Sequence, residues 1–158
     1  MVGIELHGDH DTLDQRIEHY LAAETIPGLF QRILERYERD YDRERAGLVR
    51  NTMSLLWAAR RGLSESELMD LLGTDEGPLP RAYWSPLSLA AEQSLVTRSG
   101  LVGFGHDYLR QAVRDRYLPA APGQREAHLR LASYFESQAL GRRKVDELSG
   151  GKLAYVYL

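Results

Sequence analysis

A histidine and an aspartate stand together where a predicted β-hairpin gives way to a predicted helix. His106 and Asp107 follow the apolar run 101–104 and precede apolar residues at helical spacing. An aspartate there is stabilised by the unpaired N–H groups and the dipole of the helix N-terminus. A histidine there can contact a ligand, although a lone histidine at a helix start is more often a hydrogen-bonded structural residue. His106 is therefore the candidate binding residue, and from the residues alone both interpretations stay open.

Other catalytic and metal-binding patterns are missing from the sequence. The chain has no cysteine, which excludes disulfides, thiolate metal sites and a cysteine nucleophile. It has no Gly-x-x-x-x-Gly-Lys-Ser/Thr phosphate loop, no Gly-x-Ser-x-Gly elbow and no His-Glu-x-x-His. His7 and His10 lie close together, but no third ligand stands at a defined spacing. We therefore expect no metal site and no enzyme active site within this chain.

The elements that would position His106 are a hairpin and a helix. The apolar runs 95–97 and 101–104 flank a Ser-Gly pair, which is typical of a tight hairpin turn. The helix after the hairpin has one apolar face, made of Leu109, Ala112, Val113 and Tyr117.

Helical periodicity dominates the rest of the chain. Ser64 and Glu67 form a capping-box pattern that starts a short helix ending at Gly73. A Pro/Ala/Gly-rich stretch at 118–123 predicts a break, and a polar stretch at 141–151 follows the last helix. The remaining predicted helices span about 12–23, 27–41, 46–60, 81–94 and 124–139.

This order predicts a mainly α fold with one small hairpin. Helix, short helix, helix, hairpin and helix across 46–118 form a winged-helix arrangement, a helix-turn-helix with a β-hairpin wing. The predicted organisation has four parts: a leading helical segment at 1–43, a winged-helix domain at 44–120, a trailing helix at 121–148, and a tail at 149–158 (Ser149 to Leu158) without an assigned role.

Charge and hydropathy narrow the partners and the location. Lys and Arg number 20 against 23 Asp and Glu, a net charge of −3 that argues against a dedicated nucleic-acid or anionic-membrane binder. No apolar run approaches the ~20 residues of a membrane helix, and the first residues are too polar for a signal peptide. We expect a cytoplasmic protein without membrane partners.

The sequence also resembles a known family. The runs RRGLSESELMDLLG, WSPLSLAAEQSLVTRSGLVGFGHDYLRQAVRDRYL, AHLRLASYFESQ and RRKVDEL resemble the winged-helix and flanking helical region of NACHT-type STAND P-loop NTPases, of the nephrocystin-3 and telomerase-protein-1 kind. The resemblance covers about residues 8–148. It implies an upstream NTPase core and a downstream repeat or sensor domain in a parent protein.

The same resemblance implies a role for His106. In the setting Phe104-Gly105-His106-Asp107, the family histidine reaches the phosphates of bound ADP and holds the inactive state. ADP or ATP would then be the cofactor of the parent, and none would bind this chain alone, because the phosphate loop is missing. The expected function is a non-catalytic regulatory module that packs on the ATPase core and senses ADP. The alternatives are a winged-helix DNA-binding transcriptional regulator, and a protein-interaction module that uses Tyr83 and Trp84 as exposed aromatics.

Overall fold

The protein is mainly α-helical. The structure, a computed structural model, describes residues 15, 17 and 25–154. Most of the predicted helix at 12–23 lies outside the described residues. Within them, the elements are α2 (Ile26–Tyr41), α3 (Leu48–Ala58), α4 (Glu65–Leu72), α5 (Arg81–Ala90), β1 (Leu95–Arg98), β2 (Leu101–Phe104), α6 (Asp107–Tyr117) and α7 (Ala121–Ala154).

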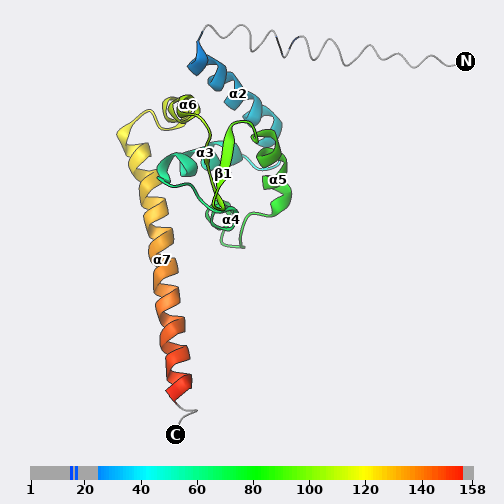
Figure 1. Ribbon diagram of the computed structural model, residues 1–158. Helices are drawn as coiled ribbons and strands as arrows, with labels where there is room; N and C mark the ends of the chain where they lie inside the picture. Colours follow the sequence, from blue (N-terminus) through cyan, green and yellow to red (C-terminus); the bar gives the residue numbers. More distant parts are fainter. Residues whose placement is uncertain (1–14, 16, 18–24, 155–158) are drawn as a thin grey trace, which may run out of the picture.

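Helix α3 is the centre of the core, as its apolar sequence predicts. It contacts α2, α4, α6, α7 and β2, and Figure 1 shows it surrounded by the other elements. A helix that packs on several neighbours has apolar residues on more than one face. Its buried residues are Leu48, Val49, Thr52, Met53, Leu55, Leu56 and Ala58.

The predicted start of α4 is confirmed. The Ser64 hydroxyl accepts the N–H of Glu67 at 3.3 Å, and a Glu67 carboxylate oxygen accepts the N–H of Ser64 at 2.8 Å. Together these bonds satisfy two donors that the first turn of a helix leaves unpaired. The predicted helix at 81–94 is shorter in the structure, because α5 ends at Ala90 and a turn leads into β1.

The predicted hairpin is also confirmed. Strands β1 and β2 pair antiparallel, from Leu95 opposite Phe104 to Arg98 opposite Leu101. Ser99 and Gly100 both have positive φ, 51° and 78°, as a two-residue hairpin turn of type I′ requires. Leu63 pairs with β2 as well, because it exchanges two backbone hydrogen bonds with Val102, at 3.0 and 2.7 Å.

Helix α2 is fastened to α6 by a polar cluster. The Arg116 guanidinium donates to both carboxylate oxygens of Glu38, at 2.9 and 2.6 Å, and the Tyr117 hydroxyl donates to the same carboxylate. The hydrogen bonds from Arg116 hold the pKa of Glu38 below its usual value despite partial burial. Nearby, Asp42 accepts the N–H of Val49 at 2.9 Å at the start of α3, while burial raises the pKa of this carboxyl.

The last helix differs from its prediction at both ends. Helix α7 begins at Ala121 and continues to Ala154, so the predicted break at 118–123 is present but shorter, at 118–120, and the predicted end at 139 is wrong. Pro122 lies in the first turn, where its missing N–H costs nothing. In Figure 1, α7 starts beside α3 and α6 and then runs away from the other elements.

Candidate functional site

His106 occupies the N-cap position of α6 and is exposed to solvent. Its side chain makes no capping hydrogen bond, and its ring centroid lies 6.1 Å from that of Phe30 on α2. Asp107 beside it is also exposed. The described residues include no group of three or more His, Asp or Glu side chains placed to hold a metal ion. His106 therefore stays a predicted binding residue.

The predicted aromatic interaction surface is wrong for one of its two residues. Trp84 retains only 2% of its accessible surface and belongs to the core, while Tyr83 is partly buried against it. Helix α5 packs against α2, where the Tyr37 hydroxyl donates to the Ala90 carbonyl at 3.1 Å. This packing turns Trp84 inward, so a partner cannot reach it without unfolding α5.

The inner face of α7 fastens this helix to the body. Ala127 and Leu131 are buried, and α7 packs on α3. Arg130 donates to the carbonyl of Leu71 at the end of α4, and the Tyr134 hydroxyl donates to Asp70 at 2.9 Å. These contacts fix the first part of α7 and leave its opposite side uncovered by the described elements.

That opposite side carries a row of apolar residues, here named the outward stripe: Leu129, Ala132, Phe135, Ala139 and Leu140. At about 100° per residue, Leu129 and Leu140 point the same way, and the other three lie within a third of a turn of that direction. The exposed fractions are 56% for Leu129, 43% for Phe135 and 59% for Leu140. Every residue from 135 to 141 is exposed. Helix α7 is therefore apolar on two faces, and only the inner face is covered by described elements.

Within the predicted helix at 124–139, the spacing of His128, Leu131, Ala132, Phe135 and Ala139 places these residues on one face. Among its members, Leu131 is buried on the inner face. Ala132, Phe135 and Ala139 belong to the outward stripe, and His128 is exposed with its ring 5.4 Å from that of Trp57. The apolar spacing therefore signalled a helix correctly, and the structure shows that most of this face is exposed.

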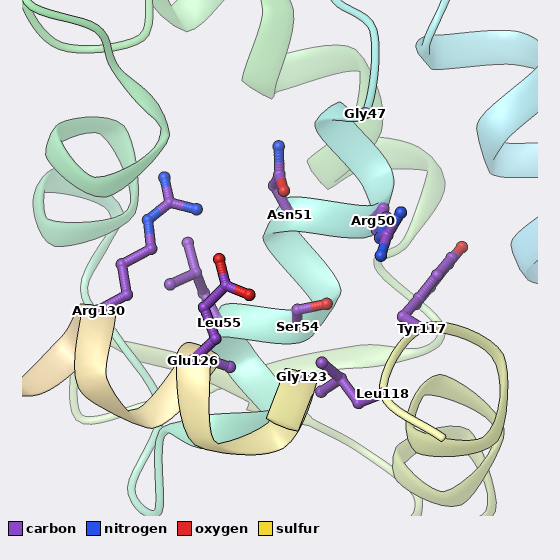
Figure 2. A pocket seen from close by; sticks show the side chains of 11 residues that line it. Gly47, Arg50, Asn51, Ser54, Leu55, Tyr117, Leu118, Gly123, Glu126 and Arg130 are labelled. Carbon is purple, nitrogen blue, oxygen red and sulfur yellow. The ribbon is translucent and has the colours of Figure 1, made fainter. Parts of the chain in front are cut away.

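A cavity of about 340 Å³ lies at the junction of α3 and α7. Figure 2 shows its lining, which includes Arg50, Asn51 and Ser54 of α3 and Glu126 and Arg130 of α7. Its lining has one carboxylate and no histidine. The Ser54 hydroxyl therefore has no histidine in this lining to activate it as a nucleophile. The arrangement provides polar contacts at the junction and no catalytic pair.

A second hollow, of about 320 Å³, lies beside the hairpin and is here named the arginine hollow. The side chains of Val96, Arg98 and Leu101 line it from the strands. The chain after α3 and the first turn of α6 contribute further charged side chains: Arg60, Arg61, Asp107 and Arg110. The sequence was only weakly indicative of this hollow, because Arg60 and Arg61 are equally typical of the basic residues at the C-terminal end of a helix.

Comparisons with known proteins give two long relatives. No family model matches the chain, and no solved structure matches it. A TPR repeat-containing protein of Dictyostelium discoideum is 34% identical over 145 residues, which cover 91% of this chain and 9% of that protein. Tetratricopeptide repeat protein 41 of Mus musculus is 26% identical over 137 residues, covering 75% of this chain and 10% of that protein. The chain thus spans about a tenth of the length of the relatives that it matches.

These names overturn the family assignment made from the sequence. Both relatives are named for tetratricopeptide repeats, and neither name refers to a NACHT or STAND NTPase. The predicted role as a regulatory module that packs on an ATPase core and senses ADP is therefore wrong, while His106 as a binding residue stays a prediction. Of the residues that the structure describes, none form a helix long and apolar enough to cross a membrane.

Proposed function

We propose that this chain is a non-catalytic protein-interaction module whose outward stripe on α7 docks a helical repeat of the tetratricopeptide type. The observation that carries the proposal is the exposed middle part of α7. From residue 135 to residue 141 every side chain is exposed, and the stripe places three large apolar side chains in solvent.

The energetics favour a partner for this face. A helix without tertiary packing is only marginally stable in water, and most helical stability in proteins comes from burying an apolar face. Covering what remains exposed of Leu129, Phe135 and Leu140 would contribute roughly 3 kcal/mol, at about 2 kcal/mol for each fully buried side chain. A helical partner would therefore stabilise α7 as well as bind it.

The names of the relatives support a helical repeat as that partner. Tetratricopeptide repeats are helix–turn–helix units that stack and bury a continuous apolar core between neighbours. A helix with an unpaired apolar face can fill the groove of such an array, using contacts about one turn apart. The spacing of the outward stripe suits this mode of recognition.

We further propose that residues 48–117 form a winged-helix unit that serves as a scaffold for protein contacts. The order α3, α4, α5, β1, β2, α6 and the pairing of Leu63 with Val102 support this fold. In that fold α5 would take the place of a DNA-reading helix. Its exposed large hydrophobic residue is Leu89, at 73%, and its basic residue Arg81 lies 3.6 Å from Glu65. This surface favours protein over DNA.

The test is binding to the tetratricopeptide-repeat segment of the Dictyostelium relative, supplied as a separate polypeptide and followed by calorimetry. The variant replaces Leu129 and Leu140 by aspartate. We expect it to lose binding, because two charges would be buried without partners. Circular dichroism checks that the variant keeps its helices.

The control is Gln138→Asp, which adds one of the two charges of the variant on an exposed residue half a turn away from Leu129. We expect it to bind like the unmodified chain. The proposal fails if the repeat segment does not bind, if both variants weaken binding equally, or if the stripe instead pairs two copies of this chain in sedimentation experiments.

A further inference from the structure

We infer that the arginine hollow binds an acidic segment of a protein partner, with glutamate or aspartate side chains against its arginines and apolar side chains on its floor. This site is separate from α7 and adds a partner chemistry to the proposed interaction role. It uses different residues, so either proposal can fail while the other holds.

The fold builds the hollow from three separate parts of the chain. Side chains at alternate positions of a strand point to the same side, which puts Val96 and Arg98 together on one face of the hairpin. Their strand partners Gly103 and Leu101 share this face. Gly62 and Arg61 approach from the segment that pairs with β2, and Arg110 approaches from the first turns of α6.

Four arginines gather here in a chain whose net charge is −3. The described ion pairs of arginine side chains belong to Arg36, Arg39, Arg81, Arg114 and Arg116. Arg60, Arg61, Arg98 and Arg110 have none among the described residues, and Asp107 is the one carboxylate in the lining. Such an excess of like charge is unfavourable by itself and is relieved by an anionic partner.

Arg110 is held in place while its neighbours remain exposed. Its guanidinium donates to the Trp57 carbonyl at 3.1 Å and lies 5.9 Å from the centre of the Trp57 ring. Arg60, Arg61 and Arg98 are exposed at the rim. A guanidinium presents two parallel N–H donors that match a carboxylate, so the rim suits acidic side chains geometrically as well as electrostatically.

The floor of the hollow distinguishes a peptide from a nucleic acid. Val96, Leu101 and Phe104 are partly buried and give it an apolar base. A nucleic-acid backbone would place phosphates over this apolar floor and beside the Asp107 carboxylate. Proteins that bind nucleic acids usually present a continuous basic stripe instead. A segment that mixes acidic and apolar side chains satisfies both the rim and the floor.

The test measures the binding of a short fluorescent peptide that mixes glutamate and leucine, by anisotropy at low and at high salt. The variant carries Arg61→Gln and Arg98→Gln, which leaves the contacts of Arg110 with Trp57 unchanged. We expect at least about a tenfold weaker Kd, since hydrogen bonds to charged groups contribute this much or more. Thermal unfolding followed by circular dichroism verifies that the variant stays folded.

Arg125→Gln is the matched control, because Arg125 is an exposed arginine on α7 outside the hollow. Arg125→Gln removes one positive charge, as each substitution in the hollow does, and should leave the Kd of the peptide unchanged. A peptide with glutamine in place of glutamate should bind much more weakly. The inference is overturned if the glutamate peptide does not bind, if Arg125→Gln weakens its binding as much as the double variant does, or if a short DNA duplex binds the hollow more tightly.

Discussion

Alanine at Gly62 is expected to cost far more stability than alanine at Gly100, although both residues have positive φ. The φ angles are 88° at Gly62 and 78° at Gly100. A Cβ on Gly62 would lie 2.3 Å from the carbonyl oxygen of Val102, whereas a Cβ on Gly100 would meet nothing within 4 Å. The two substitutions therefore share one backbone cost and differ in one steric contact.

The size of the difference follows from the pairing of Leu63 with Val102. A left-handed conformation costs alanine about 1–2 kcal/mol at either position. At Gly62 the Val102 carbonyl must also move, and it accepts the N–H of Leu63 at 3.0 Å while Val102 donates back at 2.7 Å. Losing both hydrogen bonds adds about 1 kcal/mol each. We expect a loss of about 3–4 kcal/mol for Gly62→Ala and about 1–2 kcal/mol for Gly100→Ala.

Urea unfolding of the unmodified chain and both variants measures the difference. At an unchanged slope, the midpoints report the change in unfolding free energy directly. Equal losses of unfolding free energy in the two variants would refute the reasoning. The pairing of Leu63 with Val102 would then tolerate a Cβ atom at position 62.

Two further predictions concern the core and the α2–α6 contact. Trp84→Ala should lower the unfolding free energy by about 3–5 kcal/mol. Trp84→Phe should lower it much less, because phenylalanine keeps most of the ring and removes a buried indole N–H that has no partner among the described residues. An alanine variant as stable as the unmodified chain would contradict the buried position of Trp84. Hydrogen bonds from Arg116 lower the pKa of folded Glu38, so its contribution to stability is complete above the ordinary value of 4.5 and is lost as pH falls through the lowered pKa. Glu38→Gln should therefore reduce the loss of stability in acid, measured as the difference from the unmodified chain; Asp42, whose pKa is raised, contributes with the opposite sign in both proteins. An identical acid dependence of the two proteins would contradict this account.

The elements with local signals could be predicted from the sequence. The Ser-Gly turn specified the hairpin, and the capping box of Ser64 and Glu67 specified the start of α4. The apolar spacing of α6 gave its buried face correctly, because Leu109, Ala112, Val113 and Tyr117 are all buried in the structure. In each case the information lies within a few residues of the chain.

The features that were missed depend on contacts between distant segments. Trp84 is buried because α5 packs on α2, and no local pattern reveals that orientation. Pro122 suggested a break in a stretch where it instead occupies the first turn of α7. Since α7 is apolar on two faces, periodicity alone could not tell the inner face from the outward stripe. The arginine hollow combines residues from 60 to 110, which only the folded hairpin brings together.

Amide hydrogen exchange along α7 tests the proposed interaction most directly. The exchange would be measured for the chain alone and with the tetratricopeptide-repeat segment of the Dictyostelium relative. The account predicts fast exchange over residues 135–141 in the chain alone, because these residues are all exposed, and clearly slower exchange there when the repeat segment is bound. Unchanged exchange over residues 135–141, or protection confined to other elements, would contradict docking on the outward stripe.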